Sequence, residues 1–98
     1  MKRSENAIQI QNVVFTAAKP EDVQTGHLGW ISFVLAGSLK IDGITLRRSL
    51  SGRLTLSFPA RTDRCGRRYF ILRPLGDEAR REIERQVFAA IRIPEDVA

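Results

Sequence analysis

The chain is poor in the residues from which most catalytic and metal sites are built. Its 98 residues include one cysteine, Cys65, and one histidine, His27. A nucleophile needs an activating base and a metal needs several ligands, but His27 has no acidic or thiol neighbour in sequence and Cys65 has no candidate base. We therefore predict that the protein is not an enzyme and has no metal site or cofactor. His27 is expected in a surface turn, and Cys65 as an incidental exposed thiol.

Long apolar runs are also missing. The longest nearly apolar stretch, residues 28–39, is too short to span a bilayer and contains Ser32 and Gly37. The first residues lack the apolar run of a signal peptide, and a single cysteine cannot form a disulfide within the chain, which suits a reducing compartment. These features predict a soluble cytoplasmic protein, with neither a membrane nor a small-molecule substrate as partner. One domain should cover residues 1–98, with flexible ends at 1–6 and 94–98.

Acidic residues are scarce in one region. Between Arg47 and Arg73 the chain has eight arginines, no lysine and one acid, Asp63. That segment is formally +7 while the whole chain is +5, so the remainder is net negative. Charge this local indicates a polyanionic partner, most simply nucleic-acid phosphate. Arginine suits phosphate and guanine contacts, although a GC-rich genome would produce the same bias without any function.

Alternating apolar and polar residues predict five strands, separated by turn-forming segments. The strands are expected at 8–15, 28–36, 39–41 continuing into 44–48, 53–58 and 69–73. The hydrophobic phase flips at Asp42-Gly43, which predicts a bulge or tight turn. Residues 28–36 are apolar on both faces, as in a central strand, and Pro59 should end the fourth strand.

One helix is predicted near the C-terminal end. Asp77 is the expected N-cap, and an apolar stripe with helical spacing continues to about Ile91. Five strands followed by one helix predict an α+β fold, in which a single antiparallel sheet of about five strands is covered by the helix on one face.

The candidate binding surface begins with the loop 60–68. It holds four arginines, which repel one another unless an anion relieves the repulsion, and Gly66 permits a tight bend. The alternative is a solvated loop that only aids solubility. The arginines are Arg61, Arg64, Arg67 and Arg68.

The polar face of the hairpin 44–58 is a second candidate. Alternation should project Arg47 and Arg53 from the same side as three hydroxyl residues, Thr45, Thr55 and Ser57. That face can contact phosphates or simply be an ordinary solvent face. It contains no aromatic residue in this interpretation, so it does not resemble the stacking surface of single-strand binders.

The remaining candidates lie on the helix. Arg81 and Arg85 are expected on its exposed side, where acids at helical spacing make the surface nearly neutral. Arg80 falls on the apolar stripe. Its expected role is structural, with three alternatives: the side chain extends to solvent, it pairs with Asp77 or Glu84, or it crosses a subunit interface.

Aromatic residues are expected mainly inside the fold or at a subunit contact. The set is Phe15, Trp30, Phe33, Phe58, Phe70 and Phe88. Tyr69 could stack on a base beside Arg67 and Arg68, but core packing is the favoured interpretation.

From residue 28 onward the chain resembles the SpoVG family (stage V sporulation protein G, a septation regulator). The resemblance rests on 28–35 (LGWISFVL), 42–46 (DGITL), 54–61 (LTLSFPAR), Gly66, 71–74 and Arg80 before Ile83 and Val87. It implies a small homodimer with an antiparallel sheet and a C-terminal helix that acts as a bacterial regulator and binds DNA, in some cases RNA. It points to Arg61 and Arg80, and to the helix region for sequence preference. The chain differs from the family in a longer loop before Leu28 and in more arginine after Pro59.

We therefore predict a homodimeric regulatory protein that binds nucleic acid, with DNA as the first candidate and RNA as the second. Arg47, Arg53, Arg61, Arg64, Arg67 and Arg68 would neutralise phosphates, and Arg81 and Arg85 would tune selectivity. This hypothesis requires the arginines to form one continuous cationic patch. The alternative is a protein-interaction module in which the edge strand 8–15 accepts a partner strand and the basic loop binds an acidic protein.

Overall fold

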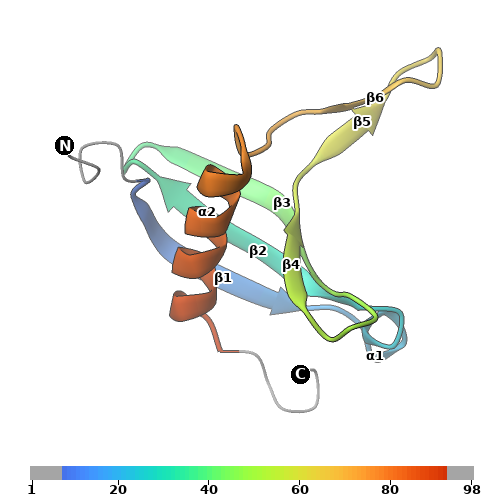
Figure 1. The fold of residues 1–98 in the computed structure, drawn as a ribbon, viewed down its shortest axis with the longest axis horizontal. Helices are drawn as coiled ribbons and strands as arrows, with labels where there is room; N and C mark the ends of the chain where they lie inside the picture. Colours follow the sequence, from blue (N-terminus) through green and yellow to red (C-terminus); the bar gives the residue numbers. More distant parts are fainter. Residues whose placement is uncertain (1–7, 93–98) are drawn as a thin grey trace.

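Four strands form an antiparallel meander, and the C-terminal helix lies across one face of it (Figure 1). The computed structural model describes residues 8–92, so the predicted flexible ends lie outside the described residues. The elements are β1 (Ile10–Ala17), α1 (Pro20–Val23), β2 (His27–Leu35), β3 (Leu39–Arg48), β4 (Leu54–Ser57), β5 (Ala60–Thr62), β6 (Arg68–Phe70) and α2 (Asp77–Ala90). The α+β class and the helix after the last strand are confirmed.

The predicted irregularity at Asp42-Gly43 is a β-bulge. Ile31 pairs with Ile44 and Phe33 pairs with Ile41, so two residues of β3 oppose Ser32. Gly43 has a φ of 80°, a backbone conformation that favours glycine. The extra residue resets the alternation, so Ile41 and Ile44 both pack toward the core.

The core lies between the sheet and α2. Its buried residues come from β2, β3, β4, the position just after β4 (Phe58) and the helix, and the helix supplies Val87 at the centre of its stripe. The buried apolar side chains in this cluster are Leu28, Ile31, Phe33, Ile44, Leu46, Leu56, Phe58 and Val87. The predicted stripe is confirmed at Val87 and Ile83, whereas Ala90 at its end is exposed. The helix begins as expected, but Gly76 occupies the N-cap position in place of Asp77.

The last predicted strand does not join the sheet. β5 and β6 pair only with each other and form a separate hairpin that projects from the body (Figure 1). We call residues 60–70 the arm. The Ile71 amide donates to the Pro59 carbonyl at 2.9 Å and closes its base. The prediction of one five-stranded sheet is wrong here because Pro59 ends β4 and the arm has no apolar face long enough to bury.

Two local predictions need smaller corrections. The loop expected before Leu28 contains the one-turn helix α1, which begins at Pro20. His27 is not in a surface turn: it opens β2, pairs with Arg47 and is half-buried. Within residues 8–92, neither helix has the length and hydropathy needed to cross a bilayer.

Candidate nucleic-acid interface

The arm presents arginine and aromatic residues on both of its faces. Cross-strand partners in an antiparallel pair share a face, and the register pairs Arg61 with Tyr69 and Ala60 with Phe70. Arg61 and Tyr69 therefore lie on one face, while Arg68 and Phe70 lie on the other. All of these except Ala60 are exposed, so the arm offers cations and rings together.

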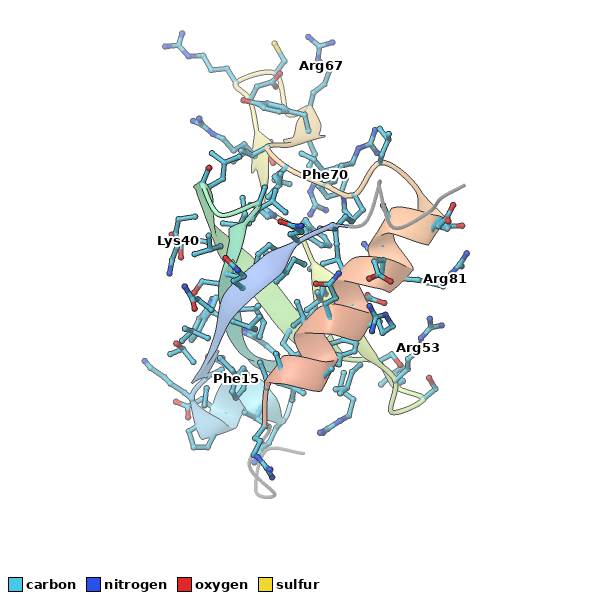
Figure 2. The ribbon with its side chains drawn as sticks, turned by 90° about the vertical axis from the view of Figure 1, so that its left-hand side faces the viewer. Phe15, Lys40, Arg53, Arg67, Phe70 and Arg81 are labelled. Atoms are coloured by element: carbon cyan, nitrogen blue, oxygen red, sulfur yellow. The ribbon has the colours of Figure 1, made fainter. Side chains whose placement is uncertain are left out.

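The tip of the arm is built by its single acid. Asp63 Oδ1 accepts hydrogen bonds from the backbone amides of Cys65 and Arg67, each at 2.9 Å. Gly66 has a φ of 85° in this turn. The second carboxylate oxygen, Oδ2, lies 3.7 Å from Arg67 Nε, in an exposed and therefore weak ion pair. Asp63 thus shapes the tip and partly neutralises Arg67, which Figure 2 shows at the end of the arm.

The other arm arginines are not matched by acids. Within residues 8–92, no carboxylate lies within ion-pair distance of Arg61, Arg64 or Arg68. The exposed guanidinium groups repel one another in a segment that does not pack on the sheet. This arrangement favours binding of an anion.

The aromatic residues of the arm are not core residues, contrary to expectation. Tyr69 is 48% exposed and Phe70 is 45% exposed, because β6 pairs with β5 alone and is not part of the main sheet. The guanidinium carbons of Arg68 and Arg73 lie 5.7 and 5.5 Å from the centroid of the Phe70 ring, within cation–π range. Phe70 therefore holds two cations in place, whereas the Tyr69 ring has no such contact among the described residues.

The remaining hairpin arginines lie away from the arm. Arg47 pairs with Thr55 near the β3–β4 turn, and Arg53 lies in that turn, where its amide donates to Ser49 Oγ. The turn and the arm are at opposite ends of β4 (Figure 1). The expected single cationic patch is therefore wrong: the arginines form separate groups. The hypothesis fails in the form that required one patch, and the arm, which holds four of the six arginines predicted to contact phosphate, is the largest separate group. Arg53 also precedes the paired residues of β4, so its predicted place on the face of Arg47 is not supported, and Figure 2 draws it on the same side of the molecule as Arg81.

On α2, Arg85 is matched and Arg81 is exposed. Arg85 Nη2 and Nε donate to Glu82 at 2.6 and 3.0 Å. Hydrogen bonds from Arg85, the larger effect, and from Gln86 lower the pKa of Glu82 from an ordinary value of 4.5 to about 2. The hydrogen bond to Glu82 raises the pKa of Arg85. The exposed side of the helix is thus nearer neutral than the arm.

Arg80 has a structural position. Its Nη1 donates to the Leu56 carbonyl at 2.9 Å and to Glu84 Oε2 at 3.1 Å, and its guanidinium lies over the Phe58 ring. Glu84 Oε2 also accepts from the Leu56 amide at 3.2 Å. Of the expected alternatives, the structure shows the pairing with Glu84.

The face of the sheet turned away from α2, here called the open face, carries a residue that the sequence analysis missed. Trp30 was expected in the core but is 41% exposed, because it alternates with the buried Ile31 and pairs with Thr45. The polar face of the hairpin therefore has no aromatic residue of its own but adjoins the Trp30 ring on β2. Ser32, two residues along on the same face, was the sequence signal that this side of β2 is not buried.

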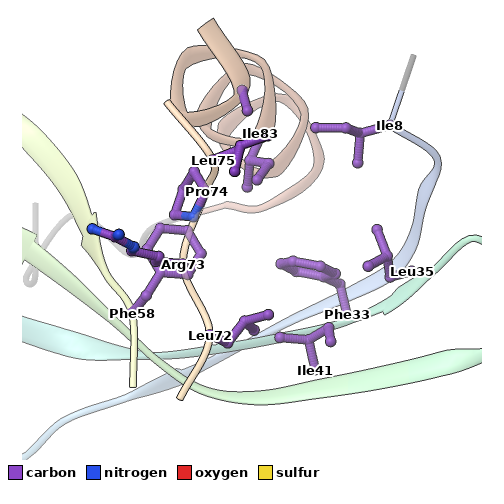
Figure 3. A pocket seen from close by; sticks show the side chains of 11 residues that line it. Ile8, Phe33, Leu35, Ile41, Phe58, Leu72, Arg73, Pro74, Leu75 and Ile83 are labelled. Carbon is purple, nitrogen blue, oxygen red and sulfur yellow. The ribbon is translucent and has the colours of Figure 1, made fainter. Parts of the chain in front are cut away.

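An apolar hollow of about 260 Å³ lies between the sheet and the start of α2 (Figure 3). Its lining includes Phe33 and Ile41 from the sheet and Ile83 from the helix, and Arg73 is the only charged lining residue among residues 8–92. Leu75, at its rim, is fully exposed. The segment between β6 and α2 thus leaves apolar surface open to solvent.

The residues considered for catalysis do not come together. Cys65 is exposed in the arm tip, while His27 is half-buried on the sheet. Residues 8–92 contain no group of three or more histidine, cysteine or acidic side chains that could hold a metal ion.

Comparison with protein-family models and with curated proteins finds no match to this chain.

Proposed function

We propose that the protein binds nucleic acid through the arm, with DNA as the first candidate and RNA as the second. The observation that carries this proposal is a projecting hairpin with four exposed arginines, of which only Arg67 has a carboxylate partner among the described residues. A projecting hairpin can follow a groove of a duplex or lie along a strand. Its guanidinium groups would bind phosphates, and Tyr69 would add a contact to sugar or base.

The cellular role we propose is regulatory, on the basis of the resemblance to the SpoVG family. The resemblance includes the proline and arginine that open the arm, Pro59 and Arg61, and the structural Arg80. Arg81 is the helix residue free to tune selectivity, because Arg85 is already paired with Glu82. Arg47 and Arg53 would contact phosphates away from the arm, so a bound strand must extend past the end of β4 to reach them.

The test is the salt dependence of binding. Affinity for a DNA duplex should fall as the salt concentration rises. In a plot of log K against log salt, each phosphate contact should contribute about −0.9 to the slope. Alanine at Arg61, Arg64, Arg67 and Arg68 should remove up to about 3.6 from that slope if each arginine contacts one phosphate. Fluorescence anisotropy with a labelled DNA duplex, and with an RNA of the same sequence, measures the affinity for each of the two candidate partners.

The control removes two positive charges elsewhere. Lys19→Ala/Arg92→Ala changes two exposed residues outside the arm, and its slope should stay close to that of the parent. An arm variant that is folded by circular dichroism and keeps the parent's affinity and slope would refute the proposal.

We also propose a homodimer, with the second copy covering the apolar hollow and the exposed segment beside it. Ile71 and Leu75 are exposed there although both are large and apolar. Ile71→Ser/Leu75→Ser should shift the equilibrium toward monomer in analytical ultracentrifugation. An unchanged dimer would place the interface elsewhere, and a monomeric parent would rule the dimer out.

A protein-interaction module remains the second candidate, because β1 is an edge strand of the sheet. Edge strands can accept a strand from a partner. Partners that persist in a pull-down after nuclease treatment would favour this function, whereas partners lost after nuclease would favour nucleic-acid binding.

A further inference from the structure

The open face of the sheet carries a row of side chains that begins near the arm. The register aligns Thr16, Trp30, Thr45 and Ser57 across β1 to β4. β4 ends at Ser57 and the arm begins at Ala60. The row therefore crosses the whole sheet from the base of the arm, and its only aromatic residue, Trp30, lies on a central strand.

The Trp30 ring is held in place but remains accessible. The rings of His27 and Trp30 are 4.8 Å apart and nearly perpendicular, at 86°. His27 Nε2 is buried and has no hydrogen-bond partner in the part of the chain that the structure describes. The edge contact restricts the orientation of the indole, which is nevertheless 41% exposed, so a flat ligand can stack on it without first displacing a side chain from the core.

Charge next to Trp30 favours an anionic ligand. Arg47 pairs with both His27 and Thr55, so it lies on the same face, diagonally across from Trp30, and is exposed. Hydroxyl groups of Thr45, Thr55 and Ser57 complete this end of the face. The one acid in the sheet strands, Asp42, lies in the bulge opposite Ser32, toward the other end of β3.

We infer that the Arg47 end of the open face is a second binding site, which takes a segment of single-stranded nucleic acid with an unpaired base stacked on Trp30 and a phosphate held by Arg47. A ring lying on a sheet can stack on an unpaired base, whereas the bases of a duplex are covered by their neighbours. This inference extends the proposed function to another surface, but it uses no residue of the arm.

A second copy of the chain fits this surface poorly. Within residues 8–92, Trp30 and Val14 are the only large apolar residues that are exposed on the open face. The rest of the Arg47 end is hydroxyl groups and a guanidinium, so these two side chains provide little of the apolar core that homodimer interfaces bury. The face therefore suits a ligand that combines a flat ring, hydroxyl-binding groups and a negative charge.

The experiment uses the fact that Trp30 is the only tryptophan in the chain. Titration with an oligomer of deoxythymidine of about 10 nucleotides, within the usual site size of such surfaces, should quench its fluorescence to a saturating level. A duplex of equal length should leave the fluorescence unchanged. Fluorescence that stays constant while anisotropy shows the oligomer bound would overturn the inference, as would equal quenching by the duplex.

Variants separate this site from the arm. In the variant with alanine at Arg61, Arg64, Arg67 and Arg68, the oligomer should still quench Trp30 at saturation, even if the arm proposal fails. By anisotropy in that background, Trp30→Ala should weaken binding about 5- to 150-fold, and Trp30→Phe should restore most of the affinity. Arg47→Ala should weaken binding, and Lys19→Ala should not.

Two results would refute the site. One is Trp30→Phe binding as weakly as Trp30→Ala while both are folded by circular dichroism. The other is a Trp30 signal that changes with protein concentration in the absence of nucleic acid, because self-association would then cover the face.

Discussion

At the scale of single residues, the most informative contact joins α2 to the edge of the sheet. β4 is an edge strand, and edge strands leave backbone groups unpaired. Both free backbone groups of Leu56 are satisfied by helix side chains: Glu84 accepts from its amide, and Arg80 donates to its carbonyl. The pair Arg80–Glu84 therefore closes this edge and fixes the helix on the sheet.

Removal of Arg80 should destabilise the fold. In Arg80→Ala the carboxylate of Glu84, only 9% exposed, loses its cation and the Leu56 carbonyl loses its donor. We expect the free energy of unfolding to fall by about 1.5–3 kcal/mol, the usual value for hydrogen bonds to charged groups. Urea denaturation measures the change. Arg81→Ala, one position along and exposed, is the control and should stay within about 0.5 kcal/mol of the parent.

Asp63 has two separable roles, in the shape and in the charge of the arm. In Asp63→Asn the side-chain oxygen can still accept from the Cys65 and Arg67 amides, while the negative charge is lost. Affinity for duplex DNA should rise about 2- to 5-fold at low salt, as expected for one exposed charge. Anisotropy titration tests this, with Asp63→Ala as the comparison that also removes the turn contacts. Weaker binding by the asparagine variant would contradict the assigned role.

At the scale of elements, α2 and the arm are stabilised in different ways. The helix buries Val87 and anchors its polar contacts on β4, and its exposed side carries Glu82 and Arg85 in an ion pair. Among residues 8–92, the contacts that hold the arm are its own strand pairing, its tip, the closing bond at Ile71 and the Arg73 guanidinium over Phe70. The helix is thus part of the cooperative core, while the arm is an appendage available for contacts.

The Glu82–Arg85 pair gives a pH dependence with a defined sign. Because the folded pKa of Glu82 is lowered to about 2, its contribution to stability is fully present above its ordinary pKa of 4.5 and is lost as the pH falls through about 2. Glu82→Gln should therefore be less stable than the parent at neutral pH, and the difference should disappear near pH 2. Urea denaturation at both pH values measures it, and Glu21→Gln in α1 controls for the loss of one negative charge.

At the scale of the whole molecule, the fold separates a packed body from a projecting arm. The body consists of the four-stranded sheet and α2 around one core. The arm leaves this body at Pro59 and returns at Ile71, whose amide bonds to the Pro59 carbonyl. The segment most rich in arginine therefore adds charge without placing it in the core.

Excision of the arm should leave the body folded. Because Pro59 and Ile71 are already joined by a hydrogen bond, residues 60–70 can be replaced by a two-residue turn such as Asn-Gly. The thermal midpoint should change by no more than a few degrees, the shift that about 1 kcal/mol produces in a domain of this size. Duplex binding should lose the salt-dependent part assigned to the arm. Loss of cooperative unfolding would show that the arm supports the core.

The sequence by itself determined the elements of the body. Alternation predicted β1 to β4, the phase change at Asp42-Gly43 predicted the bulge, and the helical stripe predicted α2, because these signals depend only on neighbours along the chain. The local concentration of arginine after Pro59 was also visible from the sequence. Only the tertiary structure decided that residues 60–70 form a separate arm, that Trp30 faces solvent and that the arginines form separate groups, because these facts depend on which strands pair and which face the single helix covers.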